Sequence, residues 1–310
     1  MASSRLNFLG PTPLSRRRAL WGMALIAPNT LGLLFFFGIP VLIAFWTSFQ
    51  QWNALKPPVY IGLENFERLV DDQMFHTALT NTLKLLGLTV PLEIVLAMGV
   101  AVLLNQPLAG RSLLRTAYFL PVVTSTVAAS IVWTGAFQQR YGILSSLLEP
   151  VGLGDYKWLV DPGLVLIPIA AVTVWQRLGF DMVIFLAGLQ SIPGVLYEAA
   201  TIDGANRWQR FRHVTLPMLS PTTFLVMVLA VINSFQIFDQ VYVMTLRTVP
   251  GGVGGSATTL AYYLYRRAFT DSEFGYASAI ALVLFVIILS VTVVQLAGQR
   301  MWVYYEAEKG

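Results

Sequence analysis

Long apolar stretches, separated by short polar segments, dominate this chain of 310 residues. Residues 19–55 contain no charged side chain, and such a stretch can cross a bilayer because about 20 apolar residues suffice. The later apolar stretches are interrupted by segments that carry most of the charges. The pattern predicts six transmembrane helices. They are expected near 21–49, 83–104, 114–136, 164–190, 217–244 and 274–299.

The composition agrees with a membrane protein built from helices. Hydrophobic residues make up 56% of the chain and charged residues only 12%, whereas a soluble domain carries roughly 25% charged residues. The chain has no cysteine, which excludes disulfides and thiolate metal sites. The fold class expected is therefore an all-α integral membrane protein. Residues 21–300 are expected to form one six-helix transmembrane domain.

Basic residues predict which side of the membrane each loop occupies, because cytoplasmic loops are enriched in Lys and Arg. Both termini and the second and fourth loops hold eleven of these residues, counting Arg115 at a span edge, and the three opposite loops hold seven. The segments 1–20 and 301–310 are therefore expected in the cytoplasm. Arg266 and Arg267 fall on the outer side. Their neighbours in 260–269 include three tyrosines, which suggests an amphipathic segment at the outer interface.

The polar loop 193–217, between the fourth and fifth expected spans, carries the most specific pattern in the chain. A helix is predicted from Val195 to Ile202, Gly204 permits a sharp turn, and Asn206 can cap a second short helix that ends near Leu216-Pro217. The small side chains of the loop allow a close approach of another surface. Its acidic side chains place charge at the rim. The loop is predicted to be a docking element. The residues expected to dock are Glu198, Ala199, Ala200, Asp203, Gly204, Ala205, Leu216 and Pro217.

This loop resembles the EAA loop of the integral membrane subunits of bacterial binding-protein-dependent ABC importers. The residues that carry the resemblance are Glu198, Ala199, Ala200, Gly204, Leu216 and Pro217, at the family's spacing. The surrounding residues 202–205 and 215–217 resemble the carbohydrate-uptake branch, which includes maltose and glycerol-3-phosphate permeases. The resemblance extends over about 21–305.

The resemblance implies the type I importer permease fold, with both termini in the cytoplasm of a bacterial cell and the chain in its inner membrane. It implies a second homologous permease, two ATP-binding-cassette ATPase subunits and an extracytoplasmic solute-binding protein as partners. The loop 193–217 would be the coupling helix that enters the ATPase subunit. No cofactor is expected in this chain, since ATP and Mg²⁺ would be bound by the ATPase subunits.

The residues by themselves also argue against enzyme activity in this chain. None of the four lysines follows a glycine-rich phosphate loop, so a Walker A motif is absent. His76 and His213 are isolated and lack the spacing of a metal site. If this chain transports a solute with energy from ATP, the ATPase is a separate polypeptide.

Polar side chains inside the expected spans predict the transport pathway, because such groups are expensive in lipid and usually face a cavity. In the fourth span they repeat at helical spacing, and in the fifth span amides do the same. The tentative substrate contacts are Thr173, Gln176, Arg177, Phe180, Asn233, Ser234 and Gln236. Amides and aromatic rings suit a sugar. In the maltose-type permeases the corresponding parts of these spans contact sugar.

Several alternatives remain open from the residues. Arg177 can face substrate or simply pair with Asp181 at i+4, and Glu93 can pair with a basic group on a neighbouring span. Asn233 and Gln236 can contact substrate or join helices. This chain has an arginine where the maltose-type pattern has a small residue, and apolar residues replace some amides, so the substrate cannot be carried over.

The function expected is uptake of a mono-, di- or oligosaccharide through a pathway formed with the second permease. The first alternative is the same machinery importing glycerol 3-phosphate or a glycerophosphodiester, since Arg177 could meet a phosphate. The second is an ion-coupled secondary transporter, for which Glu93 and Asp181 are the intramembrane acids.

Overall fold

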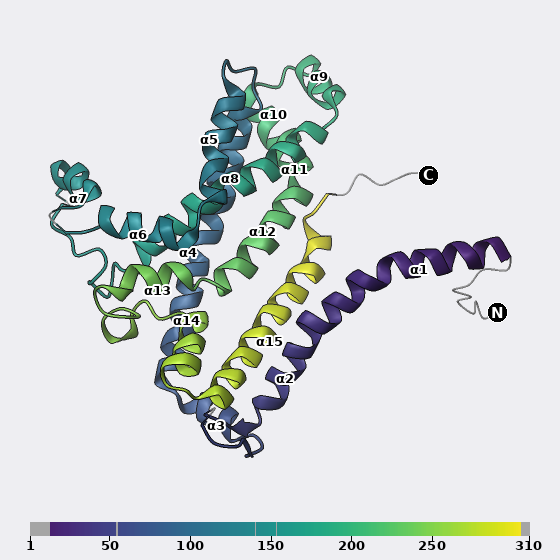
Figure 1. The fold of residues 1–310 in the computed structure, drawn as a ribbon. Coiled ribbons are helices and arrows are strands. Elements are labelled where there is room, and N and C mark those ends of the chain that lie inside the picture. The colour runs from purple at the N-terminus through teal and green to yellow at the C-terminus, as the bar shows by residue number, and fades with distance from the viewer. Residues whose placement is uncertain (1–12, 54, 140, 153, 305–310) are drawn as a thin grey trace.

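The computed structural model describes residues 13–53, 55–139, 141–152 and 154–304, and this part of the chain is almost entirely helical (Figure 1). Residues 1–12 of the expected N-terminal segment and 305–310 of the expected tail lie outside the described residues. The α-helices are α1 (Pro13–Leu33), α2 (Ile39–Thr47), α3 (Glu64–Asp71), α4 (Gln73–Leu104), α5 (Arg111–Val123), α6 (Thr126–Ala136), α7 (Ile143–Leu148), α8 (Leu166–Ser191), α9 (Gly194–Ile202), α10 (Arg207–Arg210), α11 (Leu216–Met218), α12 (Ser220–Phe235), α13 (Asp239–Leu246), α14 (Leu260–Tyr265) and α15 (Phe274–Gly298).

Short elements connect or extend these helices. The π-helical turns are η1 (Leu34–Gly38), η3 (Phe211–Thr215) and η5 (Arg266–Thr270), and the 3₁₀ turns are η2 (Glu149–Val151), η4 (Val253–Gly255) and η6 (Gln299–Met301). The strands β1 (Gln50–Gln51) and β2 (Val59–Tyr60) form a small antiparallel pair in which Gln50 lies opposite Tyr60. The fold is therefore all-α apart from this pair.

Within the described residues, four helical stretches are long and apolar enough to cross a membrane. They are Arg17–Thr47, Gln73–Leu104, Leu166–Ser191 and Phe274–Met301. Two bent pairs pass the same test together, α5 with α6 at 99° and the segment Arg207–Met218 with α12 at 63°. If each bent pair is one span, the described part of the chain has six.

The helices differ from the expected spans where capping and bending intervene. α4 begins at Gln73, earlier than expected, because the Asp72 carboxylate accepts hydrogen bonds from the N–H groups of Met74 (2.8 Å) and Phe75 (3.2 Å). The third expected span is divided between α5 and α6 at Thr124 and Ser125, and the fifth between α12 and α13 at Gln236–Phe238. Both interruptions border the same cavity, described below.

The centre of the bundle is the pair α4 and α8. Buried residues of α4 recur every three or four positions, so they form one face of the helix. α8 is buried on most of its circumference. On α8, Gly179 lies directly against the backbone of Tyr118 and Phe119 in α5, and a Cβ there would overlap the Tyr118 carbonyl oxygen. Small residues at such contacts let transmembrane helices approach closely.

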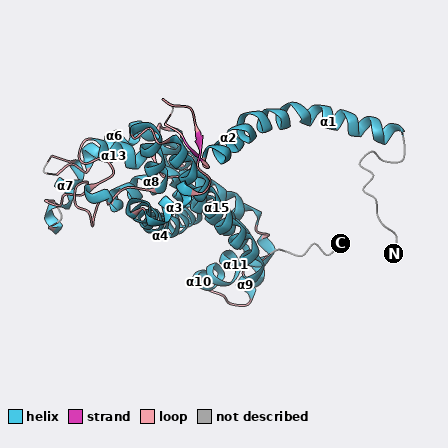
Figure 2. Cartoon of the chain, turned by 90° about the horizontal axis from the view of Figure 1, so that it is seen from below, coloured by secondary structure: helices cyan, strands magenta, loops and turns pink. Residues whose placement is uncertain are grey.

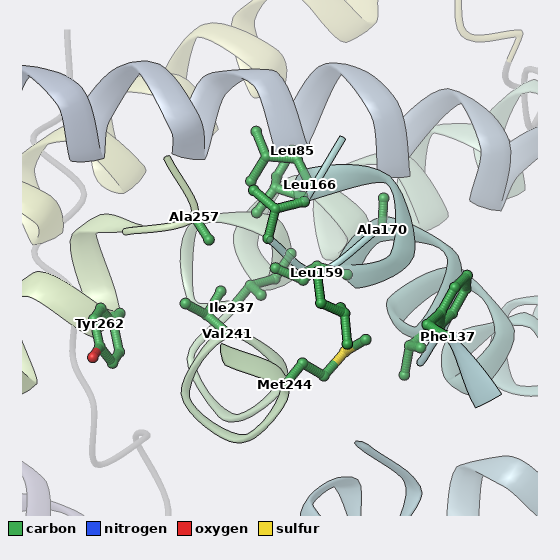
Figure 3. Packing of buried hydrophobic residues seen from close by; sticks show 13 residues of the cluster. Leu85, Phe137, Leu159, Leu166, Ala170, Ile237, Val241, Met244, Ala257 and Tyr262 are labelled. Carbon is green, nitrogen blue, oxygen red and sulfur yellow. The ribbon is translucent and has the colours of Figure 1, made fainter. Parts of the chain in front are cut away.

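Three clusters of buried apolar side chains hold the helices together. One, shown in Figure 3, joins α4 and α8 to the bent outer elements through Leu85, Leu166 and Val241, among others. A second joins α4, α12, α14 and α15, and a third joins α4 and α8 to the start of α12. α4 contributes to all three, so its position determines the arrangement of the other spans.

The first span is exceptional because it extends away from the body of the chain (Figures 1 and 2). Only 6% of its most apolar 18-residue window is buried, against 61% for α8. α2 packs on α15, whereas α1 projects freely. Its apolar surface therefore faces lipid or another subunit.

The expected outer segment 260–269 is buried on one face, while Arg266 and Phe269 are exposed. Tyr262 and Tyr263 of α14 are 5% and 1% exposed, and Tyr263 belongs to the core cluster that joins α4, α12 and α15. The expectation of a surface amphipathic segment is wrong for these two rings. The two arginines of this segment differ. Arg267 forms ion pairs with acidic side chains, whereas Arg266 makes no ion pair in the described structure.

Candidate functional site

The loop between α8 and α12 forms two short helices joined by a tight turn. α9 runs from Gly194 to Ile202, and Gly204 follows with φ +77°. This left-handed backbone conformation favours glycine, because the Cβ of any other residue would be crowded by the backbone. Asn206 caps α10: its Oδ1 accepts from the Gln209 N–H (2.9 Å), and the Gln209 Oε1 accepts from the Asn206 N–H (2.8 Å). The predicted helix, turn and cap are confirmed.

This loop is exposed, including its apolar side chains. Ile202 is 87% exposed, Val195 70% and Trp208 65%, and Glu198, Ala199 and Asp203 are exposed beside them. The loop lies at the end of the bundle opposite α3 and α14 (Figure 1). A group of exposed apolar residues rimmed by charges is typical of a protein–protein contact.

A cavity of about 640 Å³ lies where two helices are interrupted. α8 lines it with Thr173, Gln176, Arg177 and Phe180. The break between α5 and α6 contributes Val122 and Thr126, and the end of α12 contributes Leu229 and Asn233. The break between α12 and α13 adds Gln236, Ile237, Phe238, Asp239 and Gln240. Non-helical backbone at membrane depth is tolerated where it lines such a cavity.

Side chains satisfy the backbone groups that these interruptions release. Gln176 Nε2 donates to the Thr124 carbonyl (3.3 Å) and to Thr126 Oγ1 (3.1 Å), which ties α8 to the bend between α5 and α6. The Thr259 hydroxyl donates to the Ile237 carbonyl at 2.8 Å. An unpaired backbone group in an apolar interior costs several kcal/mol, about the value of a lost hydrogen bond with its desolvation. Both breaks are therefore stabilised by specific side-chain hydrogen bonds of the folded chain.

Arg177 stands between two buried carboxylates at the wall of the cavity. Its Nε lies 4.0 Å from Glu93 Oε2 on α4, and its Nη2 lies 3.9 Å from Asp181 Oδ1 one turn along α8. The carboxylates are 1% and 0% exposed, while Arg177 is 25% exposed toward the cavity and lies over the Phe180 ring at 5.6 Å. Both pairings that the sequence left open are therefore present, and Arg177 lines the cavity at the same time.

The structure brings together six of the seven residues expected to contact substrate. Thr173, Gln176, Arg177, Phe180, Asn233 and Gln236 all line the cavity. Ser234 does not: it is 2% exposed, points toward α4 and shares a hydrogen bond with Thr89 Oγ1 (2.8 Å). Several of the six also serve the fold, since Thr173 Oγ1 donates to the Ile169 carbonyl (2.8 Å) and Asn233 Nδ2 to the Leu229 carbonyl (2.6 Å).

The sequence did not single out Val122 and Thr126 at the first break, or Ile237 and Phe238 at the second. Thr126 follows Thr124-Ser125, a pair whose side chains compete for backbone hydrogen bonds and which could have signalled the interruption. Asp239 and Gln240, at the start of α13, line the cavity as well, and the sequence indicated them because Gln240 continues the helical spacing of Asn233 and Gln236. In the described part of the chain no three His, Asp or Glu side chains gather as a metal site would need.

The comparison with known proteins bears directly on this arrangement. The family model described as "Binding-protein-dependent transport system inner membrane component" matches residues 83–302, which include the cavity and the exposed loop. The chain belongs to this family. The resemblance expected from Glu198 to Pro217 is confirmed, and so is the placement among inner membrane components of transport systems.

Known permease proteins are similar to the chain over most of its length. The probable ABC transporter permease protein YesP of Bacillus subtilis is 37% identical over 301 residues, 95% of each chain. The arabinooligosaccharides transport system permease protein AraP of the same organism is 35% identical over 87% of this chain and 85% of that protein. A chain of a bacterial ABC transporter that imports the acidic polysaccharide alginate shares the fold, with a TM-score of 0.80 at 24% identity over 92% of this chain and 96% of that one.

Proposed function

We propose that this permease forms, with a second permease subunit, the membrane pathway of an ATP-driven importer of sugars. Two separate ATPase subunits bind ATP and Mg²⁺, and an extracytoplasmic binding protein delivers the sugar. Both termini and the loop between α8 and α12 lie in the cytoplasm. The chain itself performs no chemistry on its substrate.

The observation that carries this proposal is the exposed helix–turn–helix between Glu198 and Pro217 in a chain of this family. Ile202 and Trp208 of this segment are 87% and 65% exposed, at the end of the bundle where α8 and α12 meet. A protein that docks there moves α8 and α12 directly, since the loop continues into both helices. The docking residues proposed are Glu198, Ala199, Ala200, Asp203, Gly204, Ala205, Leu216 and Pro217.

The cavity chemistry supports a sugar as the substrate. Gln176, Asn233, Gln236 and the hydroxyl of Thr173 offer donors and acceptors, and the Phe180 ring offers an apolar face, as hydroxyl-rich rings require. The relatives named for arabinooligosaccharides and for trehalose and maltose favour the same class. These residues, with Arg177, are the proposed substrate contacts.

The surroundings of Arg177 favour a neutral sugar over glycerol 3-phosphate. The buried carboxylates of Glu93 and Asp181 already lie beside its guanidinium, and Asp239 adds an acid at the cavity wall itself, so this charge distribution disfavours a phosphate in the cavity. An ion-coupled secondary transporter is disfavoured by the family, whose members are components of binding-protein-dependent systems. Sugar import driven by ATP is the remaining interpretation.

The proposed mechanism is alternating access. Closure of the ATPase subunits pulls α9 and α10, and this motion rotates α8 and α12, which carry six of the cavity residues. Because Gln176 ties α8 to the bend between α5 and α6, that bend moves with α8. The cavity then opens alternately to either side of the membrane.

The experiment that tests the proposal compares Gly204→Val with Gly194→Val in vesicles that hold the complete importer. Valine at φ +77° costs about 1–2 kcal/mol and distorts the turn, whereas Gly194 has no positive φ and a Cβ added there would meet no atom within 4 Å. We expect Gly204→Val to hydrolyse ATP with sugar uptake reduced about tenfold or more, and Gly194→Val to behave as the wild type. Unchanged coupling in Gly204→Val would refute the role of the loop.

A further inference from the structure

A second cavity, of about 420 Å³, lies at the same end of the molecule as the docking loop. Its walls come from three places: the end of α4 and the residues after it, the end of α8, and the segment from α9 to η3. Its volume falls in the range of small-molecule sites, about 300–1,000 Å³. It is separate from the proposed sugar cavity and shares no lining residue with it.

The polar lining of this cavity is positively charged. Arg207 and Arg210 line it, together with the amides of Asn105 and Gln106, and no Asp or Glu does. Among the described residues neither arginine forms an ion pair, although Glu198 and Asp203 belong to the same loop. Arg210 Nη1 donates to Thr201 Oγ1 at 3.0 Å, but its Nε is buried without a hydrogen-bond partner.

The rest of the wall is apolar and firmly held. Leu189 is 6% exposed, and Tyr197 and Phe211 pack against the core cluster of α4 and α8. The Tyr197 hydroxyl lies 3.0 Å from Thr215 Oγ1, which joins α9 to η3 across the cavity wall. The site therefore combines guanidinium groups that form no ion pair with an apolar wall that includes two aromatic rings.

We propose that this cavity binds an organic phosphate: an anionic phosphate ester whose charge meets Arg207 and Arg210 and whose organic part lies on Phe211 and Leu189. Guanidinium groups bind phosphate through paired, charge-assisted hydrogen bonds. The ester is either the headgroup of an anionic phospholipid or a phosphate ester from the cytoplasm. The placement of this cavity on the cytoplasmic side rests on the proposed function, whereas the chemistry of the site is independent of it.

Binding here would affect coupling, because the ligand connects two parts of the chain that move differently. Asn105 and Gln106 follow α4, the central helix of the bundle, while Arg207 and Arg210 belong to the loop that docks the ATPase subunit. A bound phosphate ester ties the loop to α4. The occupied site restrains the motion of α9 and α10.

The test uses the purified importer in nanodiscs and two variants, Arg207→Gln/Arg210→Gln and the control Arg212→Gln. Arg212 is exposed in the same loop and does not line the cavity. In neutral phosphatidylcholine discs, phenyl phosphate binding is measured by calorimetry. We expect affinity for one site per permease to fall about tenfold or more in the double variant only, since about 1.4 kcal/mol corresponds to a factor of ten. The ATPase sites contribute equally to every variant.

A second arm measures phosphatidylglycerol retained by the importer, by native mass spectrometry. Loss of retained lipid only in the double variant, without phenyl phosphate binding, identifies a lipid headgroup; arginine-dependent phenyl phosphate binding identifies a soluble ester. If neither arm depends on the two arginines, the proposal is wrong. It is also wrong if the double variant releases the ATPase subunit with ligand binding unchanged, because the cavity then receives an acidic side chain of that subunit.

Two features keep this test decisive. If the double variant does not fold, Arg207→Gln alone serves, because Arg207 is exposed and forms no hydrogen bond through its side chain in the described structure. The assays measure binding and not uptake. Failure of the proposed sugar import would appear as absent uptake in the wild type, independently of these binding results.

Discussion

At the scale of single residues, the ionic group Glu93, Arg177 and Asp181 is the feature of the chain that costs most free energy to bury. Two fully buried carboxylates share one guanidinium, and neither ion pair is short enough for a hydrogen bond. Taking charges out of water is unfavourable, and removing one partner of a buried pair leaves the other uncompensated. Arg177 therefore has a structural role beside its proposed contact with substrate.

We expect Arg177→Gln to destabilise the permease far more than Glu93→Gln. The first leaves two buried carboxylates without a positive charge, which costs about 3–5 kcal/mol for a buried pair and less here because Arg177 is partly exposed. The second leaves one carboxylate for one guanidinium. Thermal unfolding of the purified variants in detergent measures the difference, and Glu93→Gln combined with Arg177→Gln should recover part of the loss. Equal melting temperatures for the two single variants would contradict this account.

At the scale of elements, a cluster of charges joins α3, α4, η5 and α15 at the end opposite the docking loop. Arg68 Nη2 lies 3.0 Å from both Glu273 oxygens, and Arg267 Nη1 lies 3.3 Å from Asp271 and from Glu273. Tyr263, and Tyr276 at 2.6 Å, donate to Asp72 Oδ2. Two arginines thus meet three acids. This explains how Arg267 occurs on the proposed outer side, despite the preference of basic residues for the cytoplasm.

Asp72 connects this cluster to the start of α4. Partial burial opposes its charge, but hydrogen bonds from the two tyrosines and from the N–H groups of Phe75 and Met74 outweigh burial, so the pKa of Asp72 is lowered. Burial and the neighbouring Asp72 raise the pKa of Tyr263 to about 12, so its hydroxyl remains a donor. The carboxylate of Asp72 stabilises the fold as long as it is ionised.

We expect the stability difference between wild type and Asp72→Asn to depend on pH. A lowered pKa in the folded state stabilises above the unfolded value, about 3.9, and this stabilisation is lost as pH falls through the folded value. The difference in melting temperature should be constant from about pH 5 to 8 and shrink below about pH 4. Asp71→Asn, at an exposed neighbouring position, is the control. A difference in melting temperature that grows as pH falls would contradict the lowered pKa of Asp72.

At the scale of the whole molecule, the chain has two polar ends, and by itself it surrounds its proposed sugar cavity only in part. The docking loop marks one end and the charged cluster the other, and α1 extends outward with its apolar surface uncovered (Figure 2). The cavity proposed to bind sugar is only partly enclosed by the described residues of this chain. Both features agree with a pathway that two permease subunits share.

Labelling of single cysteines tests the proposed orientation, and the absence of cysteine in the natural chain makes the experiment direct. We expect a membrane-impermeant maleimide added to intact cells to label Lys56→Cys and not Arg212→Cys. Lys56 is exposed near Arg68 and Asp271 at the cluster end, while Arg212 is exposed in the docking loop. Opening the cells should reverse the protection of Arg212→Cys. Labelling of Arg212→Cys in intact cells would place the loop outside and refute the proposed function.

The docking loop shows how far local sequence information reaches. The helix to Ile202, the turn at Gly204 and the Asn206 cap each depend on interactions within about four residues along the chain, and all were predictable. The apolar stretches likewise predict membrane helices, because bilayer thickness sets their length. The helical spacing also identified all four α8 residues that line the cavity.

What the tertiary structure decided is where spans break and which polar groups meet. Gln176 stabilises the interruption between α5 and α6 from a helix 50 residues away, and Thr259 does the same at Ile237. Ser234 turns to Thr89 although its neighbour Asn233 lines the cavity, and Glu93 reaches Arg177 across α4 and α8. A helical period shows which residues share a face. It does not show which neighbouring helix that face meets, because packing between distant segments determines that contact.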